Sequence, residues 1–193
     1  MGGREMARLF FAVAMAPALA PRFVSLQSKV VEGAGAGALR PSSPGQAHYT
    51  LRFLGEQPTA RKEAASRAAA LVAVQGKPFD LAPETLGVFD DERRAHTFWI
   101  SAGQGKAALA AIAALLEGAL VAEGFSPEKR AFSAHMTLAR TRRRLSPAIV
   151  RRILALRFES LGSMRVDEFS LFESRPSPDG AIYVPLEVFR LGI

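Results

Sequence analysis

The tetrapeptide His-x-Thr-Leu occurs twice in this chain, at residues 48–51 and 135–138, and the two copies contain two of the three histidines in 193 residues. In a β-strand, side chains two positions apart lie on the same face, so each copy would place an imidazole beside a hydroxyl. If the two strands are neighbours, the four side chains meet in one groove. The motif therefore predicts a shared site formed by His48, Thr50, His135 and Thr137.

The landmarks around the two motifs repeat at a nearly constant spacing. The two histidines are 87 residues apart (135 − 48), and the aromatic centres of two candidate strands, Phe10 and Trp99, are 89 apart (99 − 10). Two candidate helix starts, Pro58 and Ser146, are 88 apart (146 − 58). Three independent spacings that agree this closely indicate an internal duplication. Each half is expected to run strand, helix, His-x-Thr strand, helix, strand.

Hydrophobic periodicity supports this order of elements. Apolar residues recur at helical spacing within 23–30 and 109–120, an Ala-rich helix is expected over 61–74 with Gly76 as its C-cap, and Ser146 is expected to cap a helix over 148–156. Late strands are expected over 164–172 and 182–191, and Pro185 predicts a bulge or an edge in the last strand. Residues 33–46, rich in Gly, Ala, Pro and Ser, are expected to form a flexible loop.

The N-terminal segment allows two interpretations. Its apolar residues 9–15, followed by small residues at 16–20, are similar to a secretory signal. The alternative is a buried strand over 8–15 with Pro17 in the first turn of the next helix, and the duplication favours it because a first strand is required there. No segment approaches the ~20 apolar residues that span a bilayer. We therefore expect a cytoplasmic protein.

Together these patterns predict an α+β protein. It is expected to be a bilobal internal duplication with two mainly antiparallel sheets that line a central cleft, and with helices outside. The single domain would comprise lobe one over about 6–92, lobe two over about 93–175 and a C-terminal strand over 181–191. A monomer is expected, because the duplication already supplies both halves of the site.

Composition narrows the chemistry. The absence of cysteine excludes disulfides and thiolate metal sites, and a formal net charge of +7 favours polyanionic partners. The chain contains neither a Gly-rich phosphate loop nor a His-x-x-x-His pair. Because histidine titrates near pH 6.5, one imidazole can act as a base while its partner acts as an acid. Two histidines and two hydroxyls therefore predict cleavage of a phosphodiester without a metal or cofactor.

Arginines near the motifs are candidates for binding the phosphate. Arg52 is an even number of positions from His48, so in a regular strand it shares the face of His48 and could face the cleft or solvent. Arg140 is an odd number of positions from His135, so it reaches the site only if the strand bends or ends. The basic residues at 142–144 either contact an RNA backbone or simply face solvent. His96 lacks a threonine two positions later and is expected to have no chemical role.

The two motifs in their local context resemble a known family. His-Tyr-Thr-Leu-Arg-Phe-Leu-Gly at 48–55, and Phe-Ser-Ala-His-Met-Thr-Leu-Ala-Arg at 132–140 preceded by Arg130, are similar to the motifs of two-histidine (2H) phosphoesterases. The similarity is greatest to the RNA 2′,3′-cyclic phosphodiesterase branch, also called 2′-5′ RNA ligases. Residues 8–13 and 183–186 also resemble the ends of that family, so the likeness covers nearly the whole chain.

This resemblance implies hydrolysis of an RNA 2′,3′-cyclic phosphate end to a 2′-phosphate, with reverse 2′-5′ ligation in some relatives. It implies that His48 is the proton donor, that His135 is the proton acceptor, and that the two threonines hold the phosphate. It also favours Arg130 as a substrate-binding residue. Two alternatives stay open: a 2H phosphoesterase acting on a small cyclic phosphate, such as an ADP-ribose cyclic phosphate or a cyclic nucleotide, and a non-catalytic RNA-binding module.

Overall fold

The computed structural model describes residues 6–89, 97–141, 144–178 and 180–192, so His96, Arg142 and Arg143 lie outside the described residues. The strands are β1 (Met6–Ala14), β2 (Leu39–Pro41), β3 (His48–Pro58), β4 (Phe79–Leu81), β5 (Pro83–Phe89), β6 (Thr97–Ala102), β7 (His135–Thr141), β8 (Met164–Val166), β9 (Glu168–Arg175) and β10 (Ile182–Arg190). The α-helices are α1 (Ala20–Ala34), α2 (Lys62–Gln75), α3 (Lys106–Ala122) and α4 (Pro147–Leu154).

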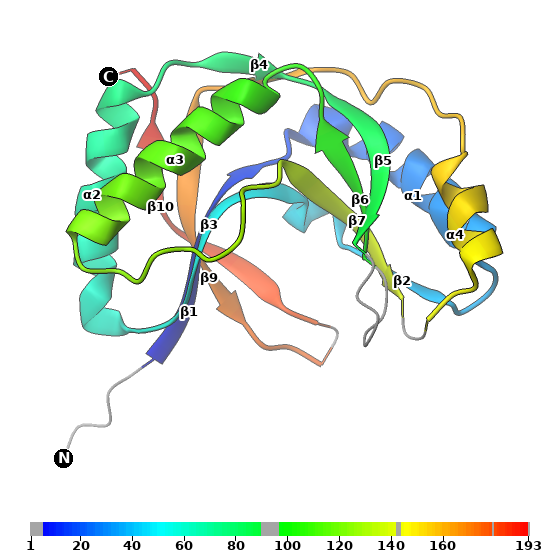
Figure 1. Cartoon of the computed structure of the whole chain (residues 1–193), viewed down its shortest axis with the longest axis horizontal. Helices are drawn as coiled ribbons and strands as arrows, with labels where there is room; N and C mark the ends of the chain where they lie inside the picture. The colour runs from blue at the N-terminus through cyan, green and yellow to red at the C-terminus, as the bar shows by residue number, and fades with distance from the viewer. Residues whose placement is uncertain (1–5, 90–96, 142–143, 179, 193) are drawn as a thin grey trace.

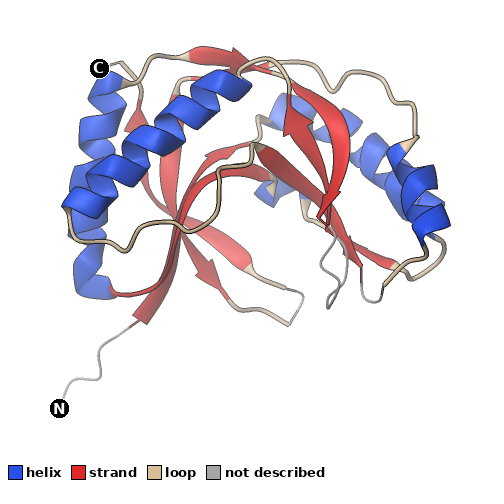
Figure 2. Ribbon diagram, in the orientation of Figure 1, coloured by secondary structure: helices blue, strands red, loops and turns tan. Residues whose placement is uncertain are grey.

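The expected α+β class with antiparallel sheets and outer helices is confirmed (Figure 1). Within the described segments, the main sheet has the order β10-β9-β1-β3-β7-β6-β5, and β2 also pairs with β7. A separate two-stranded sheet consists of β4 and β8. Helices α2 and α3 lie together on one side of the molecule and α1 and α4 on the other, with the strands between them (Figure 2).

The main sheet consists of two halves that meet at the centre. Strands β3 and β7 pair at Tyr49 and Met136, both of which are fully buried. From this junction, β3 continues with β1, β9 and β10, and β7 continues with β6, β5 and β2. The two His-x-Thr strands are therefore the innermost strand of each half, as the shared groove requires.

The two repeats exchange elements, which corrects the expected lobe boundaries. Strand β5 from the first repeat pairs with β6 of the second, and β9 from the second repeat pairs with β1 of the first. Likewise, α1 packs against β7 and α4, while α3 packs against β3 and α2. The lobes are therefore not the consecutive segments 6–92 and 93–175. Equivalent strands carry the same apolar pattern, so periodicity cannot show which repeat completes which half.

A β-bulge occurs at the same place in both His-x-Thr strands. The register of β3 against β1 shifts at Leu51, and the register of β7 against β6 shifts at Leu138, which is 87 residues further on (138 − 51). An extra residue in one strand reverses the in-out alternation beyond it. Both leucines and the residue after each are buried, and the next position, Phe53 or Arg140, is exposed.

Several local predictions are confirmed. The buried strand expected over 8–15 is β1, which lies between β9 and β3. The Ser146 hydroxyl accepts a hydrogen bond from the Ile149 backbone N–H at 3.4 Å, Gly76 caps α2, and the register shift in β10 lies between Pro185 and Glu187.

The prediction of a flexible loop over residues 33–46 is wrong in part. Helix α1 continues to Ala34, and this segment also contains β2, which pairs with the end of β7 on the edge opposite β6. The short strand was missed because three residues between glycine-rich segments show no periodicity. In the part of the chain that the structure describes, no helix has both the length and the apolar character needed to cross a membrane.

Candidate active site

The two motifs come together in one cavity between the halves of the sheet. This central cavity has a volume of about 380 Å³, and its lining includes His48, Thr50, His135, Thr137 and Arg140. Because Tyr49 pairs with Met136 in an antiparallel register, His48 lies opposite Thr137 and Thr50 lies opposite His135. The structure thus brings both imidazoles and both threonines together, as the repeated tetrapeptide predicted.

Both imidazoles are held by the same local hydrogen bond. His48 Nδ1 lies 2.7 Å from the Gln46 carbonyl oxygen, and His135 Nδ1 lies 2.8 Å from the Ser133 carbonyl oxygen. A carbonyl oxygen only accepts, so Nδ1 donates in both rings and carries the proton. Nε2 of each histidine is therefore the unprotonated nitrogen, which can accept a proton.

Aromatic rings fix the orientation of each imidazole. The ring centroid of His48 lies 5.1 Å from that of Phe10 and 5.0 Å from that of Tyr183, with Tyr183 perpendicular to it at 90°. The His135 ring is nearly perpendicular to Phe89, at 4.7 Å and 87°. Such edge-to-face packing restricts ring rotation and excludes water from one side of each imidazole.

The environment lowers the pKa of both histidines below the ordinary value of 6.5. Burial is the main cause in each case, since it disfavours the charged imidazolium. The positive charge of Arg140 lowers both pKa values further, and His135 also lowers that of His48, whereas the hydrogen bonds to Gln46 and Ser133 act in the opposite direction. Both imidazoles are therefore neutral at pH 7 in the empty site, and a bound anion would favour their protonation.

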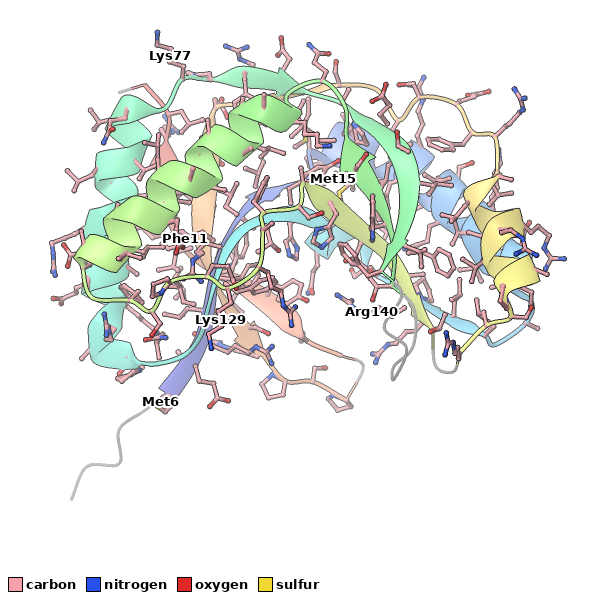
Figure 3. All side chains as sticks on the ribbon, in the orientation of Figure 1. Met6, Phe11, Met15, Lys77, Lys129 and Arg140 are labelled. Atoms are coloured by element: carbon pink, nitrogen blue, oxygen red, sulfur yellow. The ribbon has the colours of Figure 1, made fainter. Side chains whose placement is uncertain are left out.

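The bulges decide which arginine reaches the cavity. Arg140, at the end of β7, lines the central cavity because the bulge at Leu138 restores it to the face of His135 (Figure 3). The equivalent bulge at Leu51 turns Arg52 away from the face of His48. The condition that the strand must bend for Arg140 to reach the site is therefore met.

Arg52 instead connects β3 to α3 and to the segment that precedes β7. Its side chain is 8% exposed; it forms an ion pair with Glu117 and another with Glu128 at 3.5 Å, and it donates to the Ser126 carbonyl oxygen at 2.6 Å. Glu117 in turn accepts from the Glu128 backbone N–H at 2.8 Å. Arg52 thus faces neither the cleft nor solvent, the two alternatives left open for it, because simple alternation does not account for the bulge.

Arg130 is exposed, and its backbone N–H donates to Glu128 at 3.2 Å. It is not among the residues that line the central cavity, so the structure does not bring it together with the two histidines. Arg40 on β2 does line the cavity, although the sequence did not indicate it. No motif could have found Arg40, since its position depends on the pairing of β2 with β7.

The sequence matches the profile of the 2′-5′ RNA ligase superfamily over residues 24–177. The chain belongs to this superfamily. The resemblance to 2H phosphoesterases, which rests on the two motifs, is thereby confirmed.

Curated relatives in this superfamily share most of the chain. A protein of Aeropyrum pernix named RNA 2′,3′-cyclic phosphodiesterase is 34% identical over 140 residues, which is 72% of this chain and 78% of the relative. A protein of Archaeoglobus fulgidus with the same name is 30% identical over 159 residues, which is 82% of this chain and 88% of the relative.

Solved structures share the fold along the whole length. A protein of Thermus thermophilus superposes with a TM-score of 0.75 at 26% identity, covering 96% of this chain and 98% of its own. E. coli LigT in complex with 3′-AMP superposes with a TM-score of 0.72 at 25% identity, covering 97% of this chain and 98% of its own. The superfamily fold thus extends over nearly all of this chain.

Proposed function

We propose that this superfamily member hydrolyses RNA 2′,3′-cyclic phosphate ends to 2′-phosphate ends by metal-independent acid–base catalysis. The observation that carries the proposal is the convergence of two imidazoles, each with Nε2 available, two threonines and Arg140 in one cavity. The names of the Aeropyrum and Archaeoglobus relatives support the substrate class. The structure of E. coli LigT complexed with 3′-AMP supports a nucleotide as the class of ligand.

The reaction requires one proton to be removed and one to be supplied. His135 would take a proton from water as its oxygen attacks phosphorus, and His48 would protonate the 3′-oxygen as the bond between phosphorus and that oxygen breaks. The product then carries a 2′-phosphate and a 3′-hydroxyl. This assignment of the two roles follows the family resemblance, because the near-symmetric geometry of the imidazoles is compatible with either direction.

The remaining groups would stabilise the charge on phosphorus oxygens. The hydroxyls of Thr50 and Thr137, which line the cavity with Arg140, would donate to the non-bridging oxygens, and Arg140 would supply a positive charge. The anionic substrate also raises the pKa of the imidazoles, which allows His48 to enter the reaction protonated although its pKa is lowered in the empty site. If an RNA 5′-hydroxyl attacked the cyclic phosphate in place of water, the same groups would form a 2′-5′ linkage.

The decisive experiment uses a short RNA ending in a 2′,3′-cyclic phosphate, incubated with the purified protein in excess EDTA. We expect conversion to a 2′-phosphate, and we expect His48→Gln and His135→Gln each to abolish it while the circular dichroism spectrum is unchanged. His96→Gln is the matched control that removes the third histidine. Binding of the RNA without any turnover would reject the proposal in favour of a binding module. Turnover of only a small cyclic phosphate would replace RNA as the substrate.

A further inference from the structure

We propose that Arg40 binds the internucleotide phosphate adjacent to the reacting cyclic phosphate, and that this contact makes the site prefer RNA ends over mononucleotides. The inference rests on the proposed function, since it names a second phosphate of the same substrate. Four features of the structure support it: the position of Arg40 beside Arg140, the anchoring of its strand, the lack of an ion-pair partner for it among the described residues, and its contact across the cavity.

Arg40 is placed next to the catalytic centre by strand pairing. In the antiparallel pair of β2 and β7, Arg40 is the partner of Arg140, and directly opposed side chains project on the same face. Both arginines line the central cavity together with His135 and Thr137. A ligand held by Arg140 in this cavity therefore lies close to Arg40.

The strand that carries Arg40 is firmly attached. The Ser42 backbone N–H donates to the Leu138 carbonyl oxygen at 2.9 Å. The buried Gln27 side chain on α1 donates from Nε2 to the carbonyl oxygens of both Ser42 and Leu138, each at 2.8 Å. Leu138 is the bulge residue of β7, so the irregularity that directs Arg140 into the cavity is also where the end of β2 is anchored.

Arg40 and Arg140 are a pair of like charges, directly opposed in the sheet. Among the described residues, no carboxylate lies within ion-pair distance of Arg40 or Arg140. Like charges directly opposite each other in a sheet are unfavourable, and an anion between them removes the repulsion. Guanidinium groups bind phosphate through two parallel N–H donors. If Arg140 binds the reacting cyclic phosphate and Arg40 binds the phosphate next to it, each guanidinium has its own anion.

Arg40 also reaches across the opening of the central cavity. A Cβ atom placed on Gly180, in the β9–β10 turn, would lie only 2.7 Å from Nη2 of Arg40. The guanidinium thus lies against the bare backbone of Gly180, which has a φ of +115° and also lines the cavity. Arg40 extends from the β7 half of the sheet to the β9–β10 turn of the other half. This is the rim that an RNA chain crosses when only its last nucleotide enters.

The test compares a trinucleotide ending in a 2′,3′-cyclic phosphate, which has internucleotide phosphates upstream of the reacting group, with the corresponding mononucleotide 2′,3′-cyclic phosphate, which has none. We expect Arg40→Gln to lower kcat/KM for the trinucleotide by about tenfold or more, as for loss of a charged hydrogen bond, and to change the mononucleotide rate less than about twofold. The salt dependence for the trinucleotide should also weaken, by about 0.7 in the logarithmic slope for one single-strand phosphate contact.

Arg190→Gln provides the matched control, because Arg190 is an exposed arginine at the opposite end of β10 from Tyr183. It removes the same charge and should leave both rates unchanged. Equal losses on both substrates in Arg40→Gln, or no loss on either, would overturn the role of Arg40 while the proposed function stands. A wild-type protein inactive on both substrates would instead overturn the proposed function and this inference with it.

Discussion

Phe53 and Arg140 occupy equivalent positions of the two repeats, 87 residues apart (140 − 53), and both line the central cavity. The histidine and threonine positions are identical in the two repeats, so the cavity is close to symmetric at its centre. At this pair the symmetry is broken, with an aromatic ring on the side of His48 and a positive charge on the side of His135. An asymmetric nucleotide can therefore distinguish the two sides of the cavity and so distinguish the two imidazoles.

The charge of Arg140 should be visible in the titration of both histidines. Arg140→Gln removes a positive charge that lowers both pKa values, so we expect both to rise. Turnover should also fall by about 10²-fold, as for loss of one donor to a developing negative charge. Proton NMR of the imidazole signals of His48 and His135 checks the first effect. Unchanged titrations of His48 and His135 would contradict this arrangement.

Phe53 is suited to stacking on a base, because 51% of its surface is exposed although it lines the cavity. We expect Phe53→Ala to weaken binding of a nucleoside 2′-monophosphate by about 1–3 kcal/mol, the range for one base–aromatic stack. Inorganic phosphate has no base, so its affinity should not change. Calorimetric titration with both ligands separates these effects, and an equal loss for both would show that Phe53 does not stack.

Stability should depend on pH through the two buried histidines. Because folding lowers their pKa values, the unfolded chain binds more protons than the folded chain below about pH 6.5. The free energy of unfolding is thus fully retained above pH 6.5 and falls as the pH drops toward the folded pKa values. Urea denaturation from pH 5 to 8 should show this slope, and a His48→Gln/His135→Gln variant should show a smaller one. An identical slope in the variant would assign the effect elsewhere.

Arg52 should contribute to stability rather than to the binding of substrate. Arg52→Met leaves Glu117 without its ion pair and the Ser126 carbonyl without its donor; because Glu117 is 31% exposed and can be hydrated, we expect a loss of about 1–3 kcal/mol in the free energy of unfolding. Arg67, which forms an exposed ion pair with Glu123, is the matched comparison, and Arg67→Met should have little effect. Urea denaturation measures both variants. Equal stabilities would show that the Arg52 contacts are dispensable.

The fluorescence of Trp99, the single tryptophan, can be used to detect changes in packing beside His135. A Cβ atom on Gly87 would lie 2.0 Å from Cη2 of Trp99, whose ring centroid is 6.2 Å from that of His135. Gly87→Ala should therefore displace the indole, change its fluorescence and lower turnover. Gly118 on α3 has no atom within 4 Å of an added Cβ, so Gly118→Ala should leave the emission unchanged. An unchanged spectrum in Gly87→Ala would refute this contact.

The sequence alone was sufficient to predict the convergence of the two His-x-Thr pairs, the repeat and the α+β class. A strand has a period of two residues, so His-x-Thr places an imidazole and a hydroxyl on one face whatever surrounds it. The constant spacing then identified the equivalent elements, because duplicated segments retain their apolar pattern. These conclusions depend only on local geometry, which the residues themselves determine.

The tertiary structure decided which arginines reach the site. A bulge depends on how a strand is paired, so only the register against β1 and β6 shows that Arg52 turns away and that Arg140 turns in. Arg40 joins the cavity because a three-residue strand pairs with β7, a contact between segments about 100 residues apart, from Arg40 to Arg140 (140 − 40). The exchange of β5 and β9 between the repeats could not be predicted from the sequence either. Equivalent strands have the same local apolar pattern, and only long-range packing distinguishes their partners.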